Sequence, residues 1–172
     1  MIIEPMVIGI GGVSRAGKTS LALKIREWLG DDEVCILHQD EFIHPLDQMP
    51  QVEGHIDWEH PNSIDFKALT EKVKKEKELR KYVVIEGLMV FWSKELISLM
   101  DKKIYLKISK KTFLSRKTID NRWEDEPAWY IEHIWENHFV YGKLPEKERN
   151  ILQLDGEASS IDSSTKKFLG IK

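Results

Sequence analysis

The chain has 172 residues, 41% of them hydrophobic and 32% charged, and 26 basic against 29 acidic residues leave a formal net charge of −3. This length suits one domain with a substantial core, so we expect residues 1–172 to form a single domain. The nearly balanced charge argues against a dedicated nucleic-acid binder. The longest apolar run, around residues 6–12, is too short to span a bilayer, and no secretory signal begins the sequence. Cys35 is the single cysteine, which excludes an internal disulfide and a multi-cysteine zinc site. We therefore expect a cytoplasmic protein without membrane or nucleic-acid partners.

Short apolar runs alternate with helical patterns along the chain. The runs lack a regular in-and-out alternation, which is typical of strands buried on both faces of a parallel sheet. The predicted strands are 6–11, 34–38, 82–86, 103–108 and 151–154, and the predicted helices are 18–29, 63–81, 93–100 and 110–122. This alternation predicts an α/β sheet with right-handed crossovers.

Two stretches depart from this alternation. Residues 39–62 form a 24-residue connection rich in histidine and carboxylate side chains, and residues 123–142 run from acidic to aromatic. Loops this long inside compact domains are uncommon and usually functional. Because open α/β sheets bind ligands beyond the carboxyl ends of their strands, we expect both stretches to border a ligand site.

Residues 12–19 read Gly-Val-Ser-Arg-Ala-Gly-Lys-Thr, a complete G-x-x-x-x-G-K-[ST] phosphate-binding motif between a strand and a helix. Its glycines let backbone N–H groups converge on phosphate oxygens, and the helix adds its positive dipole end. Lys18 is expected to reach the β- and γ-phosphates, and the Thr19 hydroxyl to ligate Mg²⁺. The residues expected to bind the nucleotide are Gly12, Val13, Ser14, Arg15, Ala16, Gly17, Lys18, Thr19 and Ser20.

A phosphate cradle alone does not separate kinases from GTPases and motor ATPases. GTPases also carry a D-x-x-G switch and an N-K-x-D base-reading motif, and the sequence contains neither. The connection between Lys18 and the second predicted strand is also short, which leaves little room for a switch segment. A GTPase is therefore disfavoured.

Three further segments, taken with the phosphate loop, resemble the uridine kinase family in the broad sense, which includes nicotinamide riboside kinases and phosphoribulokinase-like enzymes. Residues 38–42 place a carboxylate just past the second strand, and residues 83–87 end the third strand in Glu-Gly. Residues 58–65 match the family signature aromatic-Asp-His-Pro-x-x-x-Asp in spacing. Residues 125–127 and 133–135 look more like nicotinamide riboside kinases than uridine–cytidine kinases. The resemblance covers roughly residues 5–155.

The resemblance implies a fold and a chemistry. The fold is a three-layer α/β P-loop NTPase of the nucleoside or nucleotide kinase type, with a five-stranded parallel sheet in the order 2-3-1-4-5. A short helical lid is expected at about residues 111–142. ATP and Mg²⁺ are the implied cofactors, and a small-molecule nucleoside is the implied substrate.

The resemblance also assigns roles to acidic residues. Asp40 matches the base that accepts the proton of the substrate 5′-hydroxyl, and Glu86 matches an acidic residue near Mg²⁺, where Thr19 is also expected. Glu59 stands where the family uses Asp to hold the ribose hydroxyls. Because Glu is longer by one methylene, the substrate must sit further out or the loop must adjust, and Asp57 is able to share the task.

Aromatic and basic residues complete the expected site. Trp58 is positioned to stack on the base, with ordinary packing as its alternative, and His60 belongs to the substrate-loop signature. Arg116 and Arg122, with Lys117, lie where the family carries lid arginines, whose guanidinium groups grip phosphate oxygens. The expected catalytic residues are Asp40, Lys18, Arg122 and Arg116, and the expected substrate-binding residues are Asp40, Asp57, Trp58, Glu59, His60 and Arg122.

The tryptophan-rich stretch 123–142 favours nicotinamide riboside as the acceptor. A cationic ring stacks well on an electron-rich aromatic face, and Glu124 and Asp125 are nearby in sequence. Uridine or cytidine is the alternative, and a phosphorylated sugar or pantothenate-like alcohol is a third option. A nucleotide-binding regulatory protein without transferase activity is an alternative from another class, although a pure switch needs no base such as Asp40. The donor, ATP or GTP, and the oligomeric state stay open.

Overall fold

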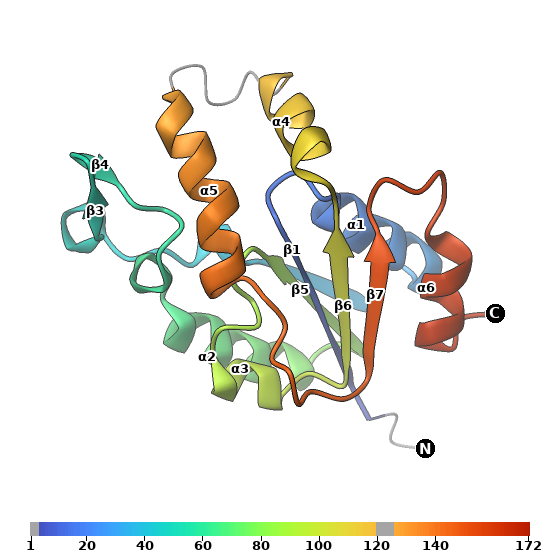
Figure 1. Ribbon diagram of the computed structural model, residues 1–172. Coiled ribbons are helices and arrows are strands. Elements are labelled where there is room, and N and C mark those ends of the chain that lie inside the picture. The colour runs from blue at the N-terminus through green and yellow to red at the C-terminus, as the bar shows by residue number, and fades with distance from the viewer. Residues whose placement is uncertain (1–3, 120–125) are drawn as a thin grey trace.

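The computed structural model describes residues 4–119 and 126–172 (Figure 1). Its central sheet consists of β1 (Met6–Gly12), β2 (Val34–His38), β5 (Tyr82–Gly87), β6 (Lys102–Lys107) and β7 (Ile151–Asp155). The strands lie in the order β2-β5-β1-β6-β7, and every neighbouring pair is parallel. Counted in chain order, this arrangement is 2-3-1-4-5. The predicted fold class and strand order are therefore confirmed.

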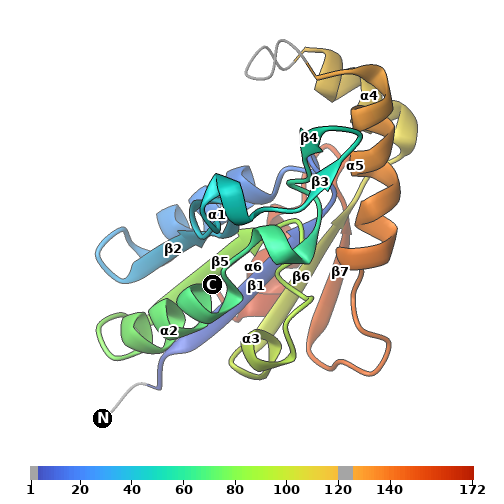
Figure 2. The ribbon, with the colours of Figure 1, turned by 90° about the vertical axis from the view of Figure 1, so that its left-hand side faces the viewer.

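Helices cover both faces of this sheet, which gives three layers (Figures 1 and 2). Their bounds are α1 (Lys18–Leu29), α2 (Phe66–Lys77), α3 (Lys94–Ser98), α4 (Lys110–Thr118), α5 (Ala128–Tyr141) and α6 (Asp162–Leu169). Apolar residues of α1 and α6 pack on one face of the sheet, and those of α2 and α3 pack on the other. None of these helices, within the described ranges, is long and apolar enough to cross a membrane.

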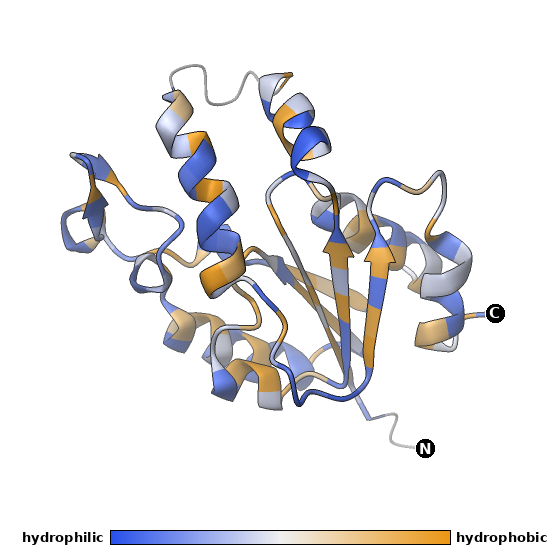
Figure 3. Cartoon of the chain, viewed as in Figure 1, coloured by the Kyte–Doolittle hydropathy of each residue, from blue (hydrophilic) through white to orange (hydrophobic). Residues whose placement is uncertain are grey.

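The sheet divides the apolar residues between two cores. In β5, Val84 belongs to the core under α1, whereas Val83 and Ile85 belong to the core under α2 and α3. Successive strand residues point to opposite faces, so a strand covered on both sides must be apolar throughout. Figure 3 shows mostly hydrophobic colouring in β6 and β7 and a mixture of hydrophobic and hydrophilic residues along the helices.

Several element boundaries differ from the predictions. The helix predicted at 63–81 is shorter, because the carboxylate of Asp65 accepts a hydrogen bond from the Ala68 N–H (2.9 Å) and caps α2 at Phe66. The helix predicted at 110–122 ends at Thr118 in α4, and residues 120–122 lie outside the described part of the chain. The predicted lid at 111–142 contains α5 and all of α4 except its first residue, Lys110, and its function as a lid stays a prediction.

The long connection after β2 contains structure that periodicity could not predict. It includes three 3-10 helices, Gln39–Glu41, Leu46–Gln48 and Pro61–Ser63, and a short antiparallel hairpin of β3 (Gln51–Val52) and β4 (His55–Ile56). The hairpin lies beside the N-terminal part of α5 (Figure 2), where the rings of His55 and Trp129 are 5.1 Å apart. Strands of two residues are too short to show an alternating pattern.

His138 of α5 is buried against the sheet. A hydrogen bond of 2.7 Å joins its Nε2 to the hydroxyl of Tyr105 in β6, and its Nδ1 has no partner among the described residues. Burial lowers the pKa of His138 to about 4, and the positive charge of Lys18 acts in the same direction. The folded protein therefore holds this imidazole in its neutral form.

This burial predicts acid sensitivity of the fold. The unfolded chain binds a proton at His138 near pH 6.5, whereas the folded chain does so only near pH 4, so stability falls as the pH decreases between these values. The loss should reach about 2 kcal/mol at pH 5. Urea unfolding at pH 7.5 and pH 5 should show a smaller loss for His138→Gln than for the wild type. The exposed His55→Gln serves as control, and parallel pH curves for His138→Gln and wild type would contradict the assignment.

Candidate active site

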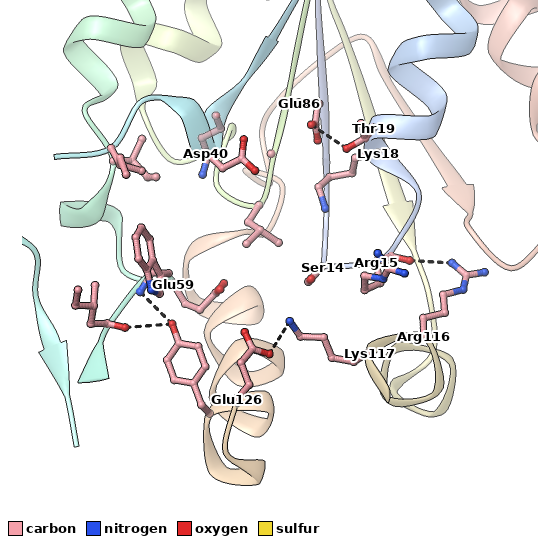
Figure 4. A pocket seen from close by; sticks show the side chains of 18 of the residues that line it. Ser14, Arg15, Lys18, Thr19, Asp40, Glu59, Glu86, Arg116, Lys117 and Glu126 are labelled. Carbon is pink, nitrogen blue, oxygen red and sulfur yellow. Dashed lines mark hydrogen bonds and ion pairs between the residues drawn. The ribbon is translucent and has the colours of Figure 1, made fainter. Parts of the chain in front are cut away.

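A cavity of about 1080 Å³ lies at the carboxyl ends of β1, β2 and β5 (Figure 4). The carboxyl ends of parallel strands meet at one edge, so the segments that follow these strands converge there. Residues of α4 and α5 close the opposite side. The lining residues are Ser14, Arg15, Gly17, Lys18, Thr19, Ser20, Gln39, Asp40, Ile43, His55, Ile56, Trp58, Glu59, Ile64, Glu86, Gly87, Leu88, Arg116, Lys117, Glu126, Pro127 and Tyr130.

The phosphate loop forms one wall of the cavity. Gly17, immediately before α1, has φ +99°, in the left-handed region where side chains are strained. At Gly12, with φ +149°, a Cβ atom would lie 2.5 Å from the Leu106 carbonyl oxygen, so both space and backbone require glycine. The loop can therefore make a tight turn into the helix.

Lys18 begins α1 and its ammonium group is buried beside this loop. Its Nζ donates a hydrogen bond to the Val13 carbonyl (2.9 Å). Burial lowers the pKa of Lys18 to about 8, while Glu86, Glu59 and Asp40 oppose the shift. A phosphate group would add negative charge beside this lysine, so anion binding would favour its protonated form.

Thr19 and Glu86 meet at a corner of the cavity. The Thr19 hydroxyl donates to Glu86 Oε1 (3.0 Å), and His38 Nδ1 lies 2.7 Å from the same oxygen. The contact with His38 follows from the sheet, because His38 and Glu86 are direct neighbours in the β2–β5 register. A hydroxyl and a carboxylate are the oxygen ligands that suit Mg²⁺, which fits the predicted role of this pair.

Asp40 reaches the cavity from the 3-10 helix that follows β2. Its neighbour Gln39 is buried, and the Gln39 side-chain oxygen accepts a hydrogen bond from the Met89 N–H (2.8 Å). Gly87 makes room for this side chain, since a Cβ atom there would lie 2.4 Å from Gln39 Cβ. This packing anchors the turn and leaves Asp40 exposed, on the side of the cavity opposite Lys18 (Figure 4).

The far end of the cavity carries a buried carboxyl group. Glu59 is only 9% exposed. Burial raises the pKa of Glu59 to about 8, with Asp57 and Glu126 acting in the same direction and Lys117 opposing them. The Glu59 carboxyl is therefore largely protonated at neutral pH in the absence of a ligand.

Two basic residues of α4 connect the helix to its surroundings. Lys117 Nζ forms an ion pair with Glu126 (2.7 Å), and the lysine side chain is only 6% exposed. Arg116 donates hydrogen bonds to the carbonyl oxygens of Arg15 (2.9 Å) and Gly156 (3.1 Å). Arg116 thus holds α4 against the phosphate loop. Lys117 is directed toward Glu126, at the end of the cavity that contains Glu59 (Figure 4).

Most of the predicted site residues lie together in the cavity. Three residues of the phosphate loop do not line it: Gly12 belongs to β1, and Val13 and Ala16 are buried under the loop. The residues that line the cavity as a group are Ser14, Arg15, Gly17, Lys18, Thr19, Ser20, Asp40, Trp58, Glu59, Glu86 and Arg116. Their individual roles stay predictions.

Other predicted residues lie elsewhere. Asp57 is buried outside the cavity lining, with its carboxylate 2.9 Å from His133 Nε2. His60 also does not line the cavity; its Nδ1 accepts a hydrogen bond from the Asn62 N–H (3.1 Å). Arg122, together with Glu124 and Asp125, lies outside the described residues.

Tyr130 and Glu126 are cavity residues for which the sequence suggested no individual role. Tyr130 contacts the segment that carries Trp58 through its hydroxyl, which accepts a hydrogen bond from the Trp58 N–H (3.0 Å). The available signal was the aromatic and acidic composition of residues 123–142. Composition indicated a ligand site but could not show which side chains face it.

The high pKa of Glu59 predicts a stability cost for this side chain. The folded state binds a proton at Glu59 near pH 8 and the unfolded state near pH 4.5, so stability falls as the pH rises through this interval. Glu59→Gln removes the titrating group, so its stability relative to the wild type should increase by roughly 3 to 4 kcal/mol between pH 5 and pH 8. Urea unfolding without ligands measures this difference, with the exposed Glu53→Gln as control. A constant difference between the Glu59→Gln and wild-type curves would contradict it.

Comparisons with known proteins place this site in a family context. Residues 7–82 match the model of the Phosphoribulokinase / Uridine kinase family. Nicotinamide riboside kinase 2 of Homo sapiens is 26% identical over 177 residues, covering 90% of this chain and 75% of the relative. A uridine kinase of Geobacillus sp. (strain WCH70) is 30% identical over 128 residues, covering 60% and 61%.

Solved structures share the fold. A possible uridine kinase from Bacillus stearothermophilus superposes with a TM-score of 0.54 at 19% identity, covering 88% of this chain and 90% of that one. An unliganded sugar kinase from Janibacter sp. HTCC2649 gives a TM-score of 0.64 at 15% identity, covering 97% and 95%. At these identities the likeness concerns the fold alone. With the sequence matches, it confirms the predicted resemblance of this chain to the uridine kinase and nicotinamide riboside kinase family of P-loop kinases.

Proposed function

We propose that this protein is a kinase that transfers the γ-phosphate of ATP to the 5′-hydroxyl of a ribonucleoside, with nicotinamide riboside as the first candidate. The observation that carries the proposal is a single cavity with a phosphate loop at one end, an exposed carboxylate, Asp40, opposite Lys18, and an acidic and aromatic pocket beyond. The relatives named nicotinamide riboside kinase and uridine kinase support a nucleoside as acceptor.

The donor would bind at the phosphate loop. Lys18 and the loop amides would hold the β- and γ-phosphates, with the positive end of α1 adding to the attraction. Thr19 and Glu86 would hold Mg²⁺, since the two oxygen donors already meet there. When bound, the metal ion would neutralise part of the negative charge of the phosphates.

The transfer itself needs alignment more than covalent chemistry. Asp40 would orient the 5′-hydroxyl of the acceptor and accept its proton as that oxygen forms its bond to the γ-phosphorus. The bond between the γ-phosphorus and the bridging oxygen breaks, and ADP leaves. Because phosphoryl transfer has a loose transition state, positioning and electrostatics account for most of the acceleration.

The groups around the reacting phosphate would then complete the site. Arg116, and by the family resemblance Arg122, would balance the charge that develops on the phosphoryl group. Residues 111–142 would act as the lid that excludes water, within a single domain. This arrangement would limit wasteful hydrolysis of ATP.

The acceptor end favours a cationic base. Trp58 lines the cavity and offers an aromatic face, and the carboxyl groups of Glu59 and Glu126 lie at the same end. A cationic nicotinamide ring nearby would lower the pKa of Glu59 and so favour the ionised form of this buried carboxyl. Uridine or cytidine, supported by the relatives named uridine kinase, is the second candidate.

An ADP-release assay with Mg²⁺, ATP and a panel of acceptors tests this function. The panel contains nicotinamide riboside, uridine, cytidine, adenosine, ribulose 5-phosphate and pantothenate, and nicotinamide riboside should give the highest kcat/KM. Asp40→Ala should lower kcat by about 10²- to 10⁴-fold because it removes the base, with ATP affinity nearly unchanged. Glu41→Ala, at the exposed neighbouring acid, is the matched control.

The outcomes separate the parts of the proposal. Preference for uridine or cytidine would keep the mechanism and contradict the argument from the cationic ring. An unchanged rate in Asp40→Ala would show that the base is assigned wrongly. If no acceptor in the panel caused ADP release while ATP still bound, the result would favour an acceptor outside the panel or a regulatory protein.

A further inference from the structure

Residues 56–59, which carry Trp58 and Glu59, are held by α5. The hydroxyl of Tyr130 accepts a hydrogen bond from the Trp58 N–H (3.0 Å) and donates one to the Ile56 carbonyl (3.4 Å). A single side chain of α5 therefore joins two backbone groups of this segment. We call residues 56–59 the acceptor segment.

A second contact joins the acceptor segment to the same helix. His133 Nε2 lies 2.9 Å from Asp57 Oδ1, and this oxygen also accepts a hydrogen bond from the Glu59 N–H (3.1 Å). Asn137 Nδ2 lies 3.0 Å from the same imidazole nitrogen. One carboxylate oxygen of Asp57 thus connects the backbone of Glu59 to α5.

The contacts come from one face of the helix. Tyr130, His133 and Asn137 are spaced i, i+3 and i+7, which places them in one stripe along α5. The carboxylate of Asp57 is directed to this stripe, and Asp57 is only 6% exposed and does not line the cavity. In this arrangement the Asp57 carboxylate is occupied by α5 and by the turn at Glu59.

We infer that Asp57 and His133 are positioning residues, which set the place of Glu59 in the acceptor site and do not contact the acceptor. The inference rests on the proposed function, since it concerns how that function's acceptor is bound. It also explains how a Glu can stand where the family uses Asp. The contact of Asp57 with α5 fixes the position of the Glu59 backbone, so the place of the longer Glu59 side chain is also constrained.

The inference predicts a specific kinetic change. Asp57→Ala frees the Glu59 N–H and leaves His133 without its carboxylate, so the acceptor KM should rise about tenfold while the ATP KM stays within about twofold. Asp57→Asn keeps an oxygen that can accept both hydrogen bonds and should stay within about threefold of wild type. The exposed Asp47→Ala, in the same connection, is the matched control.

His133 provides the second arm of the test. His133→Ala should raise the acceptor KM, and His133→Gln, whose amide can donate at the position of Nε2, should recover most of the loss. The double variant Asp57→Ala/His133→Ala should be little worse than Asp57→Ala, because both changes remove the same connection. Urea unfolding of each variant checks that the fold is retained, and the Asn and Gln variants keep the test available if an alanine variant unfolds.

The results distinguish this inference from the proposed function. If Asp57 bound the ribose through its charge, Asp57→Asn would lose acceptor affinity as Asp57→Ala does, which would overturn the inference while the kinase assignment stands. Equal rises in the acceptor KM and the ATP KM, or additive effects in the double variant, would overturn it as well. A wild-type protein that phosphorylates no acceptor would overturn both.

Discussion

The parallel pairing of β2, β5 and β1 is the constraint on which the rest of the structure depends. These strands are neighbours in the sheet but are separated by long stretches of chain, and their carboxyl ends meet at one edge. Only this pairing brings Thr19, which follows β1, to Glu86 at the end of β5. It also lets Gln39 pack into the space left by Gly87, which presents Asp40 to the same cavity. The phosphate loop, the metal-binding candidates and the candidate base are therefore consequences of one topology.

The cavity holds ionisable groups in surroundings that do not favour their charged forms. Burial shifts the pKa of Lys18 down to about 8 and that of Glu59 up to about 8. Such groups reduce the stability of the ligand-free protein, which is common where a site is organised in advance for a charged ligand. A phosphate beside Lys18 and a cation beside Glu59 would each restore the charge that burial opposes. Under the proposed function, a bound phosphate and a bound cation would each offset part of this cost, as Lys117 already does beside Glu59.

The sequence predicted the parts of this structure that depend on local pattern or on a motif. The apolar runs located β1, β2, β5, β6 and β7, and the spacing of glycines, lysine and threonine located the phosphate loop. The family resemblance supplied the strand order, from which the approach of Glu86 to Thr19 follows. The strands and the phosphate loop could be predicted because each depends on a few residues that are close in sequence, whereas the strand order needed the resemblance.

The contacts of α5 could not be predicted in the same way. Asp57 and His133 are far apart in sequence, and neither lies in a pattern that names the other as its partner. From the sequence, Asp57 is expected to share the binding of the ribose with Glu59. In the structure, the Asp57 carboxylate instead contacts His133 of α5. The raised pKa of Glu59 likewise depends on burial by several segments, which no single stretch of sequence reveals.

The most direct measurement is the ³¹P spectrum of a mixture of the protein, Mg²⁺, ATP and nicotinamide riboside as it reacts. A nucleoside 5′-kinase converts the γ-phosphate resonance into that of a phosphomonoester, whose signal is split by the two protons of the 5′-methylene group. This signal should grow in step with the formation of ADP. Formation of ADP with inorganic phosphate alone would contradict transfer to the acceptor, and with uridine and cytidine equally unreactive it would exclude a nucleoside kinase of this kind.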